Sequence, residues 1–254
     1  INGRSKFSNE FIQSLDPKIE VVFDNQKLIF RTGNGRLLWR AKSLSTEEPL
    51  MSSWISSMTP DDVVLDIGAN VGMYSIPMAK KSRIVYACEL DPLNVAILRE
   101  NMYFNSSTGN VVVLPFASGD SSKIVNVSFR DLSYGDALQS IEGCDPLATK
   151  LGLRAHSAHV VQFPLDDLFV LLDLHRPNKI KIDVDGNERA VLAGTSKLLC
   201  GAREIYFEDG RTPACADFVS FLIRNDFVEV SREEQLANND ERLLVYTKLF
   251  IKSD

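Results

Sequence analysis

Residues 63–75 read VVLDIGANVGMYS. They open with a short apolar run, interrupted at Asp66, that is long enough for a buried strand. Small residues from Gly68 to Gly72 follow, and residues 73–81 then predict a helix. A strand, a tight glycine turn and a helix form the entry unit of a doubly wound α/β fold, which binds ligands at the carboxyl edge of its sheet. Because glycine has no Cβ, a ligand can approach the backbone of this turn closely.

The spacing of the turn indicates which ligand fits. A dinucleotide site shows G-x-G-x-x-G, whose amides hold a pyrophosphate at a helix N-terminus. Here Asp66, Gly68, Asn70 and Gly72 give D-x-G-x-N-x-G instead. An acidic residue would repel a pyrophosphate but suits a ligand with an ammonium group. S-adenosylmethionine fits, since it has an amino-acid tail, a ribose and a sulfonium but no phosphate. The alternative is a tight strand-to-helix turn that binds nothing.

Length and composition set the class of protein. The chain has 254 residues and a formal net charge of −6, which predicts one α/β domain with a small appendage and argues against nucleic acid as the main partner. No apolar run approaches the roughly 20 residues of a membrane span, and no signal-peptide pattern is present. The chain begins at Ile1, as a piece of a longer protein would. Four cysteines without metal-ligand or CxxC spacing predict reduced thiols and a cytoplasmic protein: Cys88, Cys144, Cys200 and Cys215.

Residues 1–60 predict a cap that precedes the sheet. Two apolar bursts within residues 19–30 predict a β-hairpin, Leu37–Trp39 predicts a further strand, and residues 47–58 predict a helix. We expect the cap to cover the sheet edge, although its aromatic side chains could instead line a substrate pocket. Residues 61–254 then form the doubly wound domain.

An acidic residue closes the second predicted strand, Ile84–Glu89. The Glu89 carboxylate, followed by Leu90, can accept hydrogen bonds from both hydroxyls of a ribose. The alternative is a surface carboxylate at the start of the helix predicted over residues 93–104. A third strand over 111–116 leads into a loop where an adenine would lie.

That loop reads Ala117-Ser118-Gly119-Asp120. Ser118 or Asp120 could accept a hydrogen bond from the adenine amino group, and an ordinary Gly-Asp turn is an equal alternative. Residues 121–164 then interrupt the α/β rhythm, with strand-like alternation at 123–129 and 159–163. An insertion beside a ligand edge is often a lid or an acceptor-binding loop. His156 and His159 lie in it, and solvated loop histidines are commoner than catalytic ones.

The fourth predicted strand, Lys179–Val184, carries charges that a core strand would not. Alternation places Lys181, Asp183 and Asp185 on one side, and buried charges need partners. Asp183 is the first candidate for orienting or deprotonating a substrate, although a free carboxylate is a weak base. The alternative is a Lys181–Asp183 ion pair that only fixes the strand end. Glu208 follows the fifth predicted strand, Glu204–Phe207, and completes the candidate catalytic set.

Several of these segments together resemble the FkbM family of methyltransferases: DIGANVGMYS at 66–75, Glu89, FPLDDL at 163–168, IKIDVDGNE at 180–188 and EIYFE at 204–208. The similarity covers roughly residues 60–210. Asp185 stands where the family usually has Glu, and Pro77 lies inside the first helix, which could kink it. The resemblance implies the Rossmann-like class I methyltransferase fold, a mostly parallel seven-stranded sheet with an antiparallel last strand. It also implies S-adenosylmethionine as donor and a hydroxyl acceptor on a sugar, glycan or natural product.

The resemblance also implies that a metal ion could be bound. Metal-assisted O-methyltransferases of this architecture hold Mg²⁺ with acidic groups from the ends of the fourth and fifth strands. Asp183, Glu208 and Asp209 are therefore candidate ligands with oxygens of the right kind. The alternative is that one carboxylate holds the donor's ammonium and another caps a helix.

Two other functions compete with methyl transfer. A nicotinamide-dependent oxidoreductase could use a similar sheet, but it would need the phosphate-binding glycine turn that this sequence lacks. A non-catalytic module could keep the fold without the chemistry. The presence of Asp183, Asp185, Glu188 and Glu208 counts against that reading.

Overall fold

The computed structural model describes residues 17–130, 132–137, 139–141, 156–236 and 244–253. Its centre is a seven-stranded sheet with the order β12-β13-β11-β10-β3-β4-β5. Every neighbouring pair is parallel except the two made by β13, which runs antiparallel to β11 and β12. The expected doubly wound sheet with an antiparallel last strand is confirmed. Its strands are β3 (Val63–Ile67), β4 (Ile84–Cys88), β5 (Val111–Leu114), β10 (Lys179–Ile182), β11 (Glu204–Asp209), β12 (Phe227–Leu236) and β13 (Leu244–Lys252).

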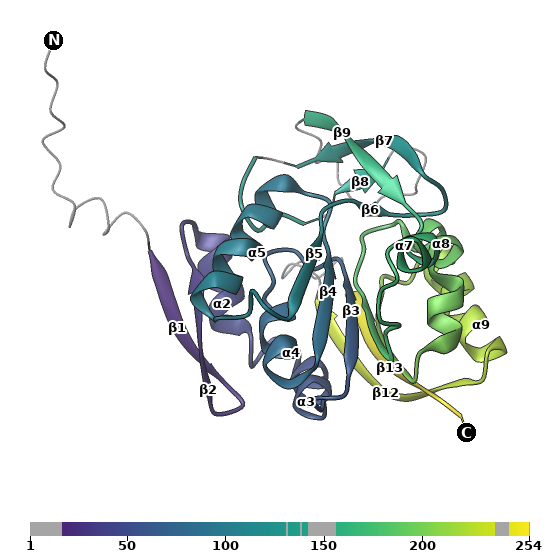
Figure 1. The fold of residues 1–254 in the computed structure, drawn as a ribbon, viewed down its shortest axis with the longest axis horizontal. Coiled ribbons are helices and arrows are strands. Elements are labelled where there is room, and N and C mark those ends of the chain that lie inside the picture. Colours follow the sequence, from purple (N-terminus) through teal and green to yellow (C-terminus); the bar gives the residue numbers. More distant parts are fainter. Residues whose placement is uncertain (1–16, 131, 138, 142–155, 237–243, 254) are drawn as a thin grey trace, which may run out of the picture.

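Helices cover both faces of this sheet (Figure 1). Residues of β3 are buried along its whole length because alternate side chains enter two different cores. Val64 packs with α3, α4 and α5, whereas Leu65 packs with α7, α8 and α9. These helices are α3 (Pro49–Ser56), α4 (Ser75–Lys81), α5 (Pro92–Phe104), α7 (Leu165–Leu171), α8 (Glu188–Gly201) and α9 (Pro213–Arg224). Pro77 is the third residue of α4, where a missing backbone N–H is tolerated.

The segment before the sheet begins with the predicted hairpin, β1 (Lys18–Phe23) and β2 (Gln26–Arg31). The expected strand at Leu37–Trp39 is wrong, because these residues lie in helix α2 (Gly35–Ser43). The Asn34 side chain accepts a hydrogen bond from the Leu37 amide and caps the helix. Leu37 and Ala41, four residues apart, are the buried face of that helix, so the apolar residues follow a helical period.

The hairpin lies against α5. Backbone amides of Ile29 and Arg31 donate to the side-chain oxygens of Asn105 and Asn101 at 2.9 Å each. These two asparagines, four residues apart on one face of the helix, therefore hold β2 in place. The chain then continues through α2, from which Trp39 lines a cavity, and through α3, which leads to the start of β3.

The insertion forms a second, four-stranded sheet with the order β6-β9-β7-β8. It lies at one end of the central sheet (Figure 1). Its strands are β6 (Ala117–Ser118), β7 (Lys123–Phe129), β8 (Ser140–Ile141) and β9 (His156–Phe163). α8 touches this sheet backbone to backbone, since a Cβ placed on Gly194 would lie 1.9 Å from the Gly119 carbonyl oxygen. Among the described residues, no helix has the length and apolarity needed to cross a membrane.

Candidate active site

The register of the sheet brings the predicted acidic residues to one edge. Ile182 of β10 lies beside Ile67 of β3 and Phe207 of β11. The residues that follow these three therefore lie next to one another at the carboxyl edge of the sheet. Those next residues are Gly68, Asp183 and Glu208. Residue 67 pairs in turn with Cys88, which places Glu89 at the same edge. A cavity of about 210 Å³ opens there and is lined by all four.

The glycine turn after β3 has the backbone that its sequence predicts. Gly68, Asn70 and Gly72 have φ values of 86°, 49° and 80°, in the left-handed region that glycine and asparagine tolerate best. A Cβ on Gly68 would lie 1.9 Å from the Asp183 carbonyl oxygen. The two strand ends therefore approach each other too closely for any other residue. Asp66 is buried below the turn and does not line the cavity.

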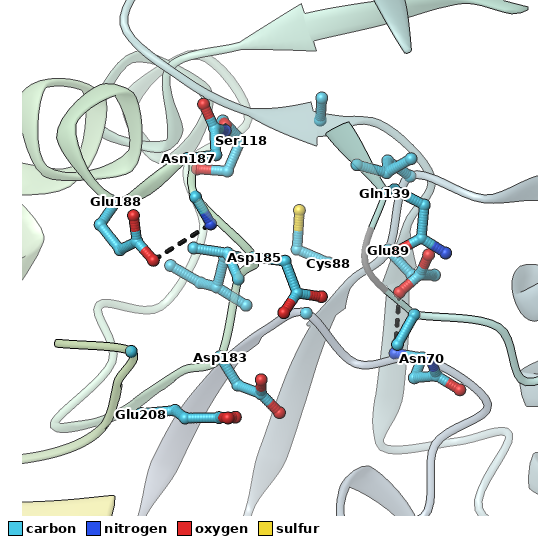
Figure 2. A pocket seen from close by; sticks show the side chains of 18 of the residues that line it. Asn70, Cys88, Glu89, Ser118, Gln139, Asp183, Asp185, Asn187, Glu188 and Glu208 are labelled. Carbon is cyan, nitrogen blue, oxygen red and sulfur yellow. Dashed lines mark hydrogen bonds between the residues drawn. The ribbon is translucent and has the colours of Figure 1, made fainter. Parts of the chain in front are cut away.

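Backbone amides from the glycine turn and from the N-cap of α5 hold the Glu89 side chain. Its two carboxylate oxygens accept hydrogen bonds at 2.8 Å from the amides of Asn70 and Asp91. Figure 2 shows the bond from Asn70. Burial raises the pKa of Glu89 to about 7 against the effect of these amides. Glu89 is only 6% exposed, and it lines the cavity together with Leu90. A carboxylate so placed can accept from ribose hydroxyls.

Ser118 lies on the cavity wall next to Asn187, whose side chain donates to the Ser118 carbonyl at 2.9 Å (Figure 2). Its hydroxyl oxygen is buried and has no hydrogen-bond partner within the described protein, while Ala117 lines the cavity next to it. A buried hydroxyl without a protein partner is expected where a ligand supplies the missing hydrogen bond. Asp120 lies elsewhere: its carboxylate accepts from Lys123 and from Gln162, outside this cavity. A role in binding adenine is therefore supported by position for Ser118 and not for Asp120.

Lys181 is buried in a cluster of acceptors. Its ammonium lies 3.1 Å from an oxygen of Asp66 and 3.1 Å from an oxygen of Asp183, and it donates to the Gly68 carbonyl at 3.2 Å. Lys181 and Asp66 are 2% and 1% exposed. Although burial opposes the charged form, the two carboxylates hold the pKa of Lys181 above its usual value. Lys181 is thus a fixed cation, and the predicted strand-end ion pair is present with a second carboxylate added.

Asp183 and Glu208 share a proton. Burial opposes the ionisation of Asp183, but Lys181 and a hydrogen bond with Glu208 hold its pKa below the usual value. Burial and the neighbouring Asp183 charge hold the pKa of Glu208 well above its usual value. Glu208 therefore carries the proton and Asp183 the charge. Asp185 extends toward the middle of the cavity (Figure 2).

Sequence reasoning missed Glu48, which precedes α3 and reaches the same cavity. Tyr206 donates to its carboxylate at 3.1 Å, and Tyr74 also hydrogen-bonds to it. Burial and the charge of Asp183 raise the pKa of Glu48 to about 7. No local pattern marks this residue, because its partners lie more than twenty residues away in the sequence.

The donor set does not fit Mg²⁺. The Lys181 ammonium already lies 3.1 Å from an oxygen of Asp183 and balances its charge. Asp209 points away from the cavity and forms an ion pair with Lys248. Across the described ranges, no group of three His, Cys, Asp or Glu side chains is arranged to hold a metal ion. The expectation of a metal at Asp183, Glu208 and Asp209 finds no support here.

The inserted segment contacts the glycine turn directly. The Asn70 side chain donates to the Asp136 carbonyl at 2.7 Å, and Asn94 donates to the same oxygen at 3.0 Å. Gln139 and Ile141 from this segment line the cavity, and a role of the segment as a lid or acceptor-binding loop stays a prediction. His159 is exposed on β9 and does not line it. The side chain of His156 lies outside the described residues.

Comparison with known proteins agrees with this arrangement. The model of the FkbM methyltransferase domain matches residues 66–229. The hexuronic acid methyltransferase AglP of Haloferax volcanii is 28% identical over 211 residues, which cover 82% of this chain and 80% of AglP. A tRNA (guanine(37)-N(1))-methyltransferase, Trm5b of Pyrococcus abyssi, is 40% identical over 63 residues, or 25% of this chain and 18% of Trm5b.

Among solved structures, the methyltransferase FkbM of Methylobacillus flagellatus KT matches with a TM-score of 0.50 and 14% identity. The match covers 85% of this chain and 59% of that one, and at this identity it bears on the fold alone. The family match extends over more than half of the sequence and includes the glycine turn, Glu89 and the carboxyl cluster. The chain belongs to the FkbM family of S-adenosylmethionine-dependent methyltransferases.

Proposed function

We propose that this protein methylates a hydroxyl group on a sugar, glycan or natural product. The observation that carries the proposal is the cluster of carboxyl groups at the end of the cavity opposite Glu89, because a hydroxyl becomes a good nucleophile only when its proton is removed. Similarity to a hexuronic acid methyltransferase over most of both chains supports a sugar as the acceptor.

The nucleoside end of the cavity fits the donor. Glu89 would accept from the ribose hydroxyls, the Ser118 hydroxyl would meet the adenine, and the turn at Gly68 and Asn70 would hold the amino-acid tail. The bound donor supplies a methyl group on a positively charged sulfur. Acidic residues that line the cavity, Asp183 and Asp185 among them, favour a cation there.

The other end of the cavity would position the acceptor. Trp39 and Arg40 line it, and they offer an aromatic face and a guanidinium to a polar ring. Asp183 is held ionised by Lys181, so it can accept a hydrogen bond from an acceptor hydroxyl and orient it. The same lowered pKa makes Asp183 a poor base. Correct alignment of two reacting groups can supply several kcal/mol of the barrier reduction.

A nucleic acid acceptor is the other candidate, because the protein shares a 63-residue stretch with a tRNA methyltransferase. We favour the sugar, since the net charge of −6 and the carboxylate-lined cavity oppose a polyanion.

Methyl transfer from radiolabelled S-adenosylmethionine tests both. Purified protein is incubated with neutral oligosaccharides, uronic acid oligosaccharides or total tRNA. We expect label in an oligosaccharide and a mass increase of one methyl group on oxygen. Label in tRNA alone would overturn the proposal.

A further inference from the structure

Glu48 comes from the segment before the sheet, outside every motif that the sequence analysis identified. Its backbone lies at the N-terminus of α3, but its side chain makes no capping bond to that helix. The carboxylate instead turns toward the ends of β10 and β11 and lines the cavity. A carboxylate at a helix start that leaves the helix uncapped serves another purpose.

Two tyrosine hydroxyls hold that carboxylate. The Tyr206 hydroxyl donates to Glu48 Oε2 at 3.1 Å, and Tyr74 hydrogen-bonds to the same side chain. Burial, followed by the charge of Glu48, holds the pKa of both tyrosines above the usual value, so both remain protonated donors. They fix the orientation of the Glu48 carboxylate without neutralising it.

The other carboxyl groups around Glu48 are committed to partners. Asp66 accepts from Ser75 at 2.6 Å and faces Lys181 at 3.1 Å, away from the cavity. Asp183 also faces Lys181, and Glu208 carries the proton that it shares with Asp183. Of these four carboxyl groups, Glu48 is the one that lines the cavity and takes its hydrogen bonds from neutral tyrosine hydroxyls rather than from an ammonium or another carboxyl group.

We propose that Glu48 is the general base of the methyl transfer. This inference rests on the proposed hydroxyl acceptor. The acceptor O–H bond breaks and its proton goes to the Glu48 carboxylate. The freed electron pair on oxygen forms the new O–CH₃ bond, while the S–CH₃ bond breaks and its electron pair stays on sulfur. Glu48 then releases the proton to solvent through the cavity.

The electrostatic surroundings suit this role. Burial and Asp183 disfavour a charge on Glu48, whereas Tyr74, Lys181 and Tyr206 favour it, and the balance puts its pKa at about 7. Glu208 and Asp185 are the further acidic groups at the ends of β10 and β11. Arg40 and Glu47 approach from the α2–α3 segment. A general base works best when its pKa lies near the working pH.

Kinetics of the variant Glu48→Gln test the inference. With an oligosaccharide acceptor that the wild type methylates, we expect kcat to fall about 10²- to 10⁴-fold, while the dissociation constant for S-adenosylmethionine stays within about twofold. The acid limb of the wild-type kcat/KM profile, which reports the free enzyme and should show an apparent pKa near 7, should disappear. Tyr206→Phe removes a donor to the ionised base, so its acid limb should move to higher pH.

Glu233→Gln is the matched control. Glu233 accepts a hydrogen bond from the Leu50 amide at 3.0 Å, so this change removes a carboxylate from the start of α3 without reaching the cavity. Its kcat and pH profile should match those of the wild type. An acid limb that survives in Glu48→Gln but disappears in Asp185→Asn would assign the base to Asp185 and overturn the inference.

Infrared pH titration provides a readout that needs no acceptor. The wild-type minus Glu48→Gln difference spectrum should show a carboxylic-acid carbonyl band that is lost as the pH rises through about 7. A difference spectrum without such a band contradicts the inference even if methyl transfer occurs. If the band is present and the wild type methylates no hydroxyl acceptor, the proposed function itself is wrong.

Discussion

Glu89 and Asp183 both bring a carboxylate to the same cavity, but the protein holds them in different ways. Backbone amides of Asn70 and Asp91 hold Glu89, and both lie within twenty residues of it. Side chains hold Asp183, and one of them, Lys181, is shared with a carboxylate from another strand. The nucleoside end thus depends on the shape of the backbone, and the acceptor end depends on a balance of charges. Substitutions at the two ends of the cavity should therefore differ in their effects on folding and on ligand binding.

The largest effect is expected where the two ends meet. In Gly68→Ala, the new Cβ would lie 1.9 Å from the Asp183 carbonyl oxygen at a φ of 86°. We expect the free energy of unfolding to fall by more than about 4 kcal/mol and donor binding to be lost. Thermal denaturation and calorimetry measure both. Gly109→Ala, which places its Cβ in open space, should change stability by less than about 0.5 kcal/mol.

Next in size is the loss of the buried cation. Lys181→Met leaves Asp66 and Asp183 facing each other without an ammonium, which should cost about 3–5 kcal/mol of folding free energy. Asp183 then loses the cation that holds its pKa down, so the destabilisation should grow as the pH rises. Urea unfolding at acidic and at neutral pH measures this trend. Lys123→Met, which removes an exposed pair with Asp120, should cost at most about 1 kcal/mol at either pH.

A change at the nucleoside end should affect binding more than folding. Glu89→Gln keeps the shape of the side chain but replaces the charged acceptor of the ribose hydroxyls. We expect the dissociation constant for S-adenosylmethionine to rise about 10- to 100-fold. Calorimetry measures it, and an unchanged affinity would contradict the placement of the ribose on Glu89.

The wild-type affinity should also depend on pH through the same group. Glu89 has a pKa of about 7 in the free protein, and only its ionised form accepts from both hydroxyls. Binding should therefore tighten about tenfold between about pH 6 and pH 8. In Glu89→Gln this dependence should largely vanish. If it persists unchanged, another group, such as Glu48, is responsible.

The smallest effect is expected at the wall of the nucleoside end. Ser118→Ala removes a hydroxyl that has no partner in the described protein, so folding stability should not fall. Donor affinity should fall about two- to tenfold if the hydroxyl bonds the adenine. Denaturation and calorimetry on the same sample separate the two effects. A clear loss of stability would show that the hydroxyl serves the protein rather than the ligand.

The same difference between the two ends decided what the sequence could predict. The glycine turn, Glu89 and the charged residues at the end of β10 follow from local spacing and strand alternation. Glu89, Asp183 and Asp185 line the cavity as expected, whereas Lys181 is buried behind Asp183. The prediction of Asp209 as a metal ligand is not supported. Strand alternation on β11 places its side chain on the opposite side of the sheet from Glu208, where it pairs with Lys248.

Glu48 could not be predicted, because its environment is assembled from Tyr74 and Tyr206, which lie in separate elements far along the chain. The error at Leu37–Trp39 has a related cause. Three consecutive apolar residues fit a short strand or a helix, and the Asn34 cap and the spacing to Ala41 select the helix. Asp120 was placed by its loop, but side-chain contacts with Lys123 and Gln162 fix it elsewhere.

The bare contact between Gly194 of α8 and the Gly119 carbonyl sets a limit on the ligands that the cavity can admit. At most contacts a side chain can change rotamer to make room for a larger ligand. Here the two backbones are in direct contact, so no side chain between them can move. A donor analogue enlarged on its base would push the Ser118 loop against a fourteen-residue helix and would have to displace it as a whole. The main chain itself should therefore select against donor analogues that carry bulky substituents on the base.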